Sequence, residues 1–145
     1  RTGGGASAPG HVPEADPRMI YETQVALRWS DMDALGHINN SEYLRYFEQA
    51  RIQFFADAHV PRESGLLVAR HEVDYRRPMP YRREPISVPT WIDKIGTTSF
   101  TFGHEVVADD VVYARARTVI VCIDDSQRPT PVPTALRKHL EQYAR

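Results

Sequence analysis

The chain has 145 residues, of which 41% are hydrophobic, enough for one domain with a buried core and too few for two ordinary domains. Its 18 lysines and arginines nearly balance its 19 aspartates and glutamates, for a formal net charge of -1. This balance excludes a general electrostatic attraction to nucleic acids or acidic membranes, so a phosphate-bearing ligand needs a local cluster of basic side chains.

The single cysteine, Cys122, excludes an intrachain disulfide and a thiolate metal site. It lies in the apolar run TVIVCI, which predicts a buried and unreactive thiol. No apolar run reaches the about 18 residues that a membrane-spanning helix needs. Residues 1–17 also lack the apolar segment of a signal peptide. We therefore expect a cytoplasmic protein without a membrane span.

The N-terminal residues 1–17 are rich in glycine, proline and alanine, which predicts a disordered tail or an expression remnant before one domain over 18–145. Residues 19–29 are rich in β-branched and aromatic side chains, so they predict a strand that ends near Trp29. The next segment, WSDMDALGHINNSEY (29–43), is polar and predicts a loop that leads into a helix.

A long helix is predicted over 41–58, because apolar side chains recur there at steps of three and four. Asn39 is the expected N-cap, and the carboxylate of Glu42, three positions later, is expected to reach back to the cap's N–H. Glu48 and Arg51 lie one turn apart and predict a charged pair that ties the helix to a sheet. The apolar positions of this helix are Tyr43, Leu44, Phe47, Ala50, Phe54, Phe55 and Ala58.

Four strands are predicted after the helix, over 66–77, 86–96, 98–108 and 111–124. The last three are joined by short turns at Gly96-Thr97 and Asp109-Asp110, so they must be antiparallel neighbours. One long apolar helix against an antiparallel sheet predicts an α+β fold, which a short helix over 134–144 completes. Three aromatic residues of the strands are expected in the core: Trp91, Phe100 and Phe102.

The last predicted strand carries apolar residues on both faces, because side chains alternate along it. The face that mixes arginines with valines would leave apolar side chains exposed, which favours assembly into a homodimer or a homotetramer. One face holds Ala114, Ala116, Thr118 and Ile120, and the other holds Arg115, Arg117, Val119 and Val121.

The segment DMDALGHINNSEY (31–43) resembles a motif of the hydroxybenzoyl-CoA thioesterase-like superfamily, Asp-x-Asp-x-x-(Gly or Gln)-His-(Val or Ile)-Asn-Asn-x-x-Tyr. The segments EYLRYFEQAR and DYRRPMPYRREPISVPTWIDKIGTTSF are similar to the same family, and the likeness covers about residues 22–142. The resemblance implies a hotdog fold, in which a curved antiparallel sheet wraps around a long central helix. It also implies a thioesterase that acts on acyl-CoA or on an acyl carrier protein, with a site between two subunits.

This resemblance assigns the catalytic carboxylate to Asp33, either as a general base on water or as a nucleophile. The helix that follows presents unpaired N–H groups, so the N–H of Asn40 or Ser41 is the predicted oxyanion donor. His37 could polarise the thioester carbonyl, bind the carboxylate or shape the loop. Asp31 is expected to hold the loop by accepting hydrogen bonds from backbone N–H groups.

The phosphates of coenzyme A or of acyl-carrier pantetheine need cations, and the densest basic cluster is formed by Arg76-Arg77 and Arg82-Arg83. Arg82 and Arg83 are the predicted substrate-binding pair, although solvated strand ends are an equal alternative. Hydrogen-bond donors for the substrate are predicted at the hairpin, from Thr98 and Ser99. No metal or other cofactor is expected, because the histidines show no ligand spacing and coenzyme A is part of the substrate.

Two other functions stay open at this point. Asp33 and His37 could serve as the acid–base pair of a hydroxyacyl-thioester dehydratase, another hotdog enzyme. The chain could also bind an acyl thioester without turnover. The Gly-His-Ile-Asn-Asn context favours hydrolysis of an acyl-CoA thioester to a free acid and coenzyme A.

Overall fold

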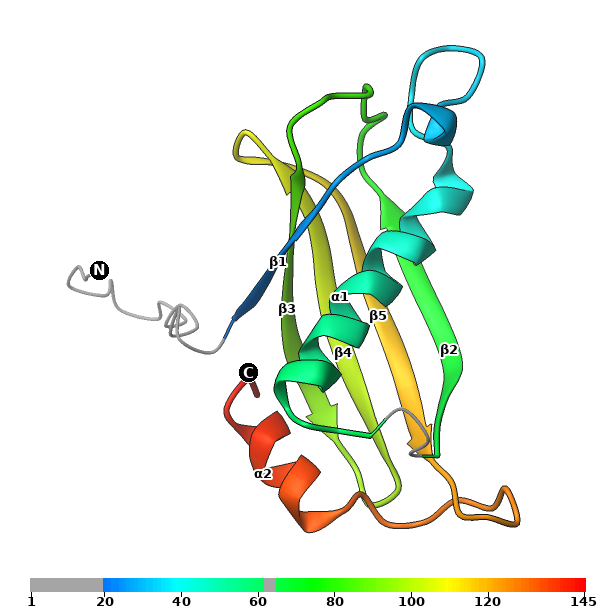
Figure 1. The fold of residues 1–145 in the computed structure, drawn as a ribbon, viewed down its shortest axis with the longest axis vertical. Helices are drawn as coiled ribbons and strands as arrows, with labels where there is room; N and C mark the ends of the chain where they lie inside the picture. The colour runs from blue at the N-terminus through cyan, green and yellow to red at the C-terminus, as the bar shows by residue number, and fades with distance from the viewer. Residues whose placement is uncertain (1–19, 62–64) are drawn as a thin grey trace, which may run out of the picture.

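The computed structural model describes residues 20–61 and 65–145, so the tail predicted over 1–17 lies outside the described residues. One antiparallel sheet curves around one long helix, α1 (Tyr43–Asp57), as Figure 1 shows. The strand order is β1-β3-β4-β5-β2. The strands are β1 (Tyr21–Val25), β2 (Leu66–Tyr75), β3 (Ile86–Ile95), β4 (Ser99–Ala108) and β5 (Val111–Cys122), and a short helix, α2 (Thr134–Glu141), follows them.

The predicted α+β hotdog arrangement is confirmed. β3, β4 and β5 are antiparallel neighbours, as their short connections require. Asp109 and Asp110 join β4 to β5 with φ of 51° and 64°, the positive pair that a two-residue hairpin turn of the favoured hand needs. The alternation predicted along β5 is also confirmed, because Ala114, Ala116, Thr118 and Ile120 are buried and the intervening residues are more exposed.

The first strand is shorter than predicted. β1 ends at Val25, which pairs with Ile86, the first residue of β3. The chain then enters a 3-10 turn over Trp29–Asp31, which begins the polar loop.

The helical segment starts with a 3-10 turn, Asn40–Glu42, which leads directly into α1. Asn39 is the N-cap as predicted, because its side-chain oxygen accepts a hydrogen bond from the Ser41 N–H at 3.1 Å. The predicted return bond from Glu42 is wrong. The Asn39 N–H donates instead to the carbonyl oxygen of Asp31 at 2.9 Å, and the Glu42 carboxylate pairs with nearby arginines.

The core lies between α1 and the concave face of the sheet. Trp91, Phe100 and Phe102 are buried, as predicted. The Cys122 thiol is also buried, and burial raises its pKa, which agrees with an unreactive side chain. The helix contributes one broad buried face, made of Tyr43, Tyr46, Phe47, Ala50, Arg51 and Phe54.

His104 is a fully buried polar residue of this core, and its ring stacks against those of Phe47 and Phe102. Its Nδ1 lies 3.0 Å from the hydroxyl of Thr90. Burial, with the nearby positive charge of Arg51, holds the pKa of His104 well below its usual value, so its imidazole is neutral at physiological pH. Within the described residues, none of the helices is long and apolar enough to cross a membrane.

Candidate active site

The polar loop before α1 is anchored by Asp31, whose side chain is 1% exposed. One carboxylate oxygen accepts hydrogen bonds from the Arg28 N–H at 3.0 Å and from the Tyr46 hydroxyl at 2.6 Å. The other accepts from the Arg28 guanidinium at 3.0 Å. Burial raises the pKa of Asp31, but these hydrogen bonds outweigh it and hold the pKa below its ordinary value. The prediction that Asp31 holds the loop is confirmed.

Between Asp31 and Asn39 the loop folds back on itself as a small hairpin. Asp33 donates its N–H to the carbonyl oxygen of His37 at 2.7 Å, and Gly36 donates to Asp33 at 3.2 Å. Gly36 has φ of 81°, a left-handed conformation that glycine adopts without strain. The Ile38 N–H donates to the carbonyl oxygen of Met79 at 2.8 Å, which fixes the hairpin against the segment that follows β2.

Asp33 lies exposed at this hairpin with its two carboxylate oxygens in different environments. Oδ1 accepts hydrogen bonds from the N–H groups of Leu35 at 2.8 Å and His37 at 3.2 Å. Oδ2 accepts no hydrogen bond from any of the residues that the structure describes. The loop therefore orients the carboxylate through one oxygen and leaves the other able to accept a proton or attack a carbonyl carbon.

The start of the helical segment supplies the backbone N–H groups that could serve as oxyanion donors. The Ser41 N–H is already committed to the Asn39 side chain. The Asn40 N–H donates to no acceptor within the described part of the chain, so it is the better placed of the two predicted oxyanion donors. Tyr75, at the end of β2, donates its hydroxyl to the Asn40 carbonyl oxygen at 2.9 Å and stacks edge-on against Tyr43.

A cavity of about 320 Å³ brings these groups together. Its lining includes three predicted catalytic residues, Asp33, His37 and Asn40, together with Arg76 and Arg77 from the segment after β2. A carboxylate, a helix start and two cations thus border one space. Such a space suits an anionic substrate whose carbonyl group gains negative charge during reaction.

The predicted substrate-binding arginines lie near this cavity but do not line it. Arg82 pairs with Asp109 of the β4–β5 turn at 2.8 Å and also donates to the carbonyl oxygen of Glu84. Arg83 is exposed beside it. Within this chain, Arg76 and Arg77 therefore take the place at the cavity that the sequence analysis gave to Arg82 and Arg83.

Thr98 and Ser99 lie at the opposite end of the sheet from the polar loop (Figure 1). β4 separates them from the loop by its ten residues, about 30 Å of extended strand. The Thr98 carbonyl oxygen accepts a hydrogen bond from the N–H of Cys122 at 2.8 Å. Within one chain, Thr98 and Ser99 do not join the Asp33 cavity.

Two tyrosines that support the site were missed by the sequence analysis. Tyr46 binds the Asp31 carboxylate, and Tyr75 binds the first turn of the helical segment. Tyr46 lies three residues after Tyr43 on the buried helix face, a spacing that could have identified it as inward-facing. Tyr75 ends an exposed strand, and nothing local in the sequence indicates its contact with Asn40.

Comparison with known proteins settles the family. The sequence pattern of the thioesterase-like superfamily matches residues 27–140, most of the chain. The chain belongs to the thioesterase-like superfamily. This membership confirms the predicted relationship and the predicted class of enzyme, a thioester hydrolase.

Solved structures of thioesterases share the fold of this chain. A predicted thioesterase from Bacillus stearothermophilus matches with a TM-score of 0.79 and 34% identity, over 87% of this chain and 97% of that one. A thioesterase from Thermus thermophilus, solved with coenzyme A and zinc, matches with a TM-score of 0.78 and 32% identity, over 89% and 97%. The acyl-CoA thioester hydrolase YbgC of Escherichia coli O6:H1 is 21% identical over 131 residues, 85% of this chain and 97% of the relative.

Proposed function

We propose that the protein hydrolyses an acyl-CoA thioester to a free carboxylic acid and coenzyme A, and that Asp33 is its catalytic carboxylate. The observation that carries this proposal is the cavity that both Asp33 and Asn40 line. The thioester carbonyl lies between them, with its carbon toward Asp33 and its oxygen toward the helix start.

Two routes use this arrangement. As a general base, Asp33 removes a proton from a water molecule while the water oxygen attacks the carbonyl carbon. As a nucleophile, a carboxylate oxygen of Asp33 attacks that carbon itself, and water then hydrolyses the resulting anhydride. In both routes the Asn40 N–H stabilises the oxyanion, and the carbon–sulfur bond breaks to release the thiolate of coenzyme A. Protonated Asp33 gives its proton to that sulfur in the first route, and the thiolate takes a proton from water in the second. His37 holds Asp33 through its backbone N–H, and a direct role for its ring stays a prediction.

Arg76 and Arg77 are the proposed phosphate ligands, because they line the cavity that contains Asp33. Guanidinium groups pair with phosphate oxygens through two parallel hydrogen bonds. An acyl carrier protein brings a phosphate on the same pantetheine arm, so this contact suits either leaving group. The cytoplasmic location stays a prediction.

An acyl-CoA panel with a reagent that traps free thiol tests the function. We expect thiol release, and we expect Arg76→Ala with Arg77→Ala to raise the KM for acyl-CoA about tenfold, because charge-assisted hydrogen bonds to the substrate are lost. Hydration of an enoyl-CoA without thiol release would support a dehydratase instead. Stabilisation of the protein by acyl-CoA without any turnover would support a binding protein.

A second copy of the chain is proposed to pair with β2, which forms one edge of the sheet. Leu67 of this edge is 51% exposed. Antiparallel pairing of two β2 strands would bring the Leu66 end of one chain toward the Tyr75 end of the other. Leu66 pairs with Cys122 of β5, and the Cys122 N–H donates to the Thr98 carbonyl oxygen, so the Thr98 turn lies at the Leu66 end of β2. In the proposed dimer this turn would approach the Asp33 cavity of the second copy.

Leu67→Asp tests this assembly, because it places a charge on the proposed contact and leaves the Asp33 cavity intact. Sedimentation equilibrium should show a dimer or tetramer for the unsubstituted protein and a monomer for the variant. Thiol release should fall with dissociation if the partner completes the site. A stable monomer with full activity would contradict the shared site.

A further inference from the structure

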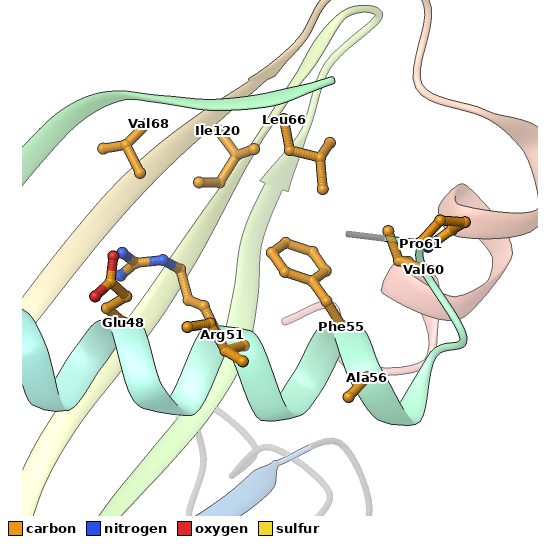
Figure 2. A pocket seen from close by; sticks show the side chains of 10 residues that line it. Glu48, Arg51, Phe55, Ala56, Val60, Pro61, Leu66, Val68 and Ile120 are labelled. Carbon is orange, nitrogen blue, oxygen red and sulfur yellow. The ribbon is translucent and has the colours of Figure 1, made fainter. Parts of the chain in front are cut away.

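A second cavity lies further along the seam between α1 and β2. The Asp33 cavity occupies the end of this seam where Tyr75 contacts Asn40. Toward the other end, a groove of about 550 Å³ opens between the later turns of α1 and the start of β2, as Figure 2 shows. Its apolar lining includes Ile52, Phe55, Val60, Leu66, Val68 and Ile120.

Arg51 interrupts this apolar lining. The residue is 5% exposed, and its side chain extends from α1 toward the strands (Figure 2). Its guanidinium has five N–H donors, yet within the described residues it makes a single hydrogen bond, to the Thr118 hydroxyl at 3.4 Å. Burial lowers the pKa of Arg51 to about 10, which records the cost of holding this cation away from water. The other donors of Arg51 have no acceptor among the described residues, and Arg51 lines the open groove, so a ligand atom that accepts from them would be bound firmly.

The charges around Arg51 select the kind of ligand. The Glu48 side chain points toward Arg51 from the preceding turn of α1 (Figure 2), and its negative charge favours the guanidinium cation. His71 of β2 shares the Thr118 hydroxyl at 3.0 Å, and burial lowers the pKa of His71, so it adds no charge at neutral pH. Among the described residues that line it, the groove therefore holds one cation and one anion. A ligand carboxylate would be repelled by Glu48, whereas a hydroxyl can accept from Arg51 and donate to Glu48.

We propose that this groove binds the acyl chain of the substrate and that Arg51, with Glu48, selects a chain that carries a hydroxyl group near its far end. The inference rests on the proposed function, because the thioester is placed at Asp33. From Asn40 to Arg51 the helical segment advances about 16 Å. The hydroxyl therefore lies near the end of a medium-length chain, and Arg51 is a specificity residue rather than a catalytic one.

Calorimetry of acyl-CoA binding tests the inference without any need for turnover. Asp33→Asn protein is titrated with dodecanoyl-CoA and with ω-hydroxydodecanoyl-CoA. We expect the hydroxylated chain to bind about tenfold more tightly, the value of a hydrogen bond to a charged group. Adding Arg51→Met should remove this preference, whereas Arg45→Met, which removes an exposed cation of the same helix, should leave it unchanged.

A second variant keeps the test decisive if Arg51→Met does not fold. Glu48→Gln changes an exposed residue, and it should improve binding of dodecanedioyl-CoA several-fold, because the repulsion of its carboxylate is removed. The inference is overturned if the hydroxyl preference survives Arg51→Met, or if dodecanedioyl-CoA binds the Glu48-containing protein more tightly than the hydroxylated chain. It is also overturned if Arg51→Met dissociates the assembly without changing acyl preference, since Arg51 would then serve a contact between copies.

The measurements distinguish an error in the inference about the groove from an error in the proposed function. Thiol release from dodecanoyl-CoA by the unsubstituted protein depends on Asp33 and not on Arg51. If thiol is released and calorimetry shows no hydroxyl preference, only the inference about the groove is wrong. If no acyl-CoA of any chain type is hydrolysed, the proposed function is wrong, and the binding measurements still decide whether Arg51 recognises a hydroxyl.

Discussion

Asp33→Asn is expected to lower kcat/KM for acyl-CoA hydrolysis by about a hundredfold or more, the loss typical of a principal acid–base or nucleophilic group. Asparagine keeps a side-chain oxygen that can accept the hydrogen bonds from Leu35 and His37, so the loop retains its shape. What the substitution removes is the negative charge and the basic oxygen. Thiol release at saturating and limiting acyl-CoA measures the effect on kcat and on kcat/KM.

A matched control separates this effect from a general loss of charge. Glu141 is an exposed carboxylate at the end of α2 that neither lines the Asp33 cavity nor lies on β2. Glu141→Gln should leave thiol release within about twofold, and both variants should melt within about 2 °C of the parent, as surface substitutions do. Full activity of Asp33→Asn would show that another group is the catalytic carboxylate.

The local chemistry of the loop was readable from the sequence because its partners are close along the chain. Asn39 caps the helical segment through Ser41, two residues away, and Asp31 accepts from the Arg28 N–H, three residues away. A motif that fits within about a dozen residues carries such contacts in its own spacing. The fold was predictable for a related reason, since one apolar helix followed by antiparallel hairpins has few ways to bury its apolar face.

Contacts between distant segments were not readable in the same way. The sequence shows two arginine pairs around the proline turn, Arg76-Arg77 and Arg82-Arg83. Nothing in the neighbouring sequence indicates which pair lies at the substrate site. Asp109, which arrives through the β4–β5 turn, engages Arg82 and leaves Arg76 and Arg77 at the cavity. Thr98 was predicted beside the substrate, although strand direction places it at the far end of the sheet in the same chain.

Arg51 shows how a regular helical pattern can include a buried charge. It lies four residues after Phe47 and three before Phe54, so the helix places it on the buried face. The one-turn spacing predicted a charged pair of Arg51 with Glu48 that ties the helix to the sheet. The structure shows that Thr118 of β5 supplies its hydrogen bond to the sheet.

Asp31→Ala should destabilise the fold as well as reduce activity. The substitution removes the acceptors of the Tyr46 hydroxyl and the Arg28 N–H, and it leaves that hydroxyl buried without a partner. Removing one partner of a buried charged network costs several kcal/mol, but the Arg28 side chain is half exposed and reduces the loss. We expect the free energy of unfolding to fall by about 2–3 kcal/mol and the melting temperature by about 5–10 °C.

The contribution of Asp31 should also depend on pH in a defined direction. The folded-state pKa of Asp31 lies below its ordinary value of 3.8, because hydrogen bonds from Tyr46 and Arg28 outweigh the effect of burial. As the pH falls, the unfolded chain therefore takes up the proton first, and folding is disfavoured. The stabilisation is fully present above about pH 5 and is lost as the pH falls through the folded-state pKa. Urea unfolding should show a smaller difference between parent and Asp31→Ala at pH 3 than at pH 7.

Tyr46→Phe distinguishes loss of the hydrogen bond between Tyr46 and Asp31 from nonspecific damage to the core. Phenylalanine fills the same space and removes only the hydroxyl, so we expect a loss of about 1 kcal/mol. If Asp31 and Tyr46 act through one hydrogen bond, the double variant should lose less stability than the two single variants combined. Strict additivity would mean that the contact contributes nothing to stability. Thiol release should fall in both single variants, because each removes a side-chain contact that anchors the loop carrying Asp33.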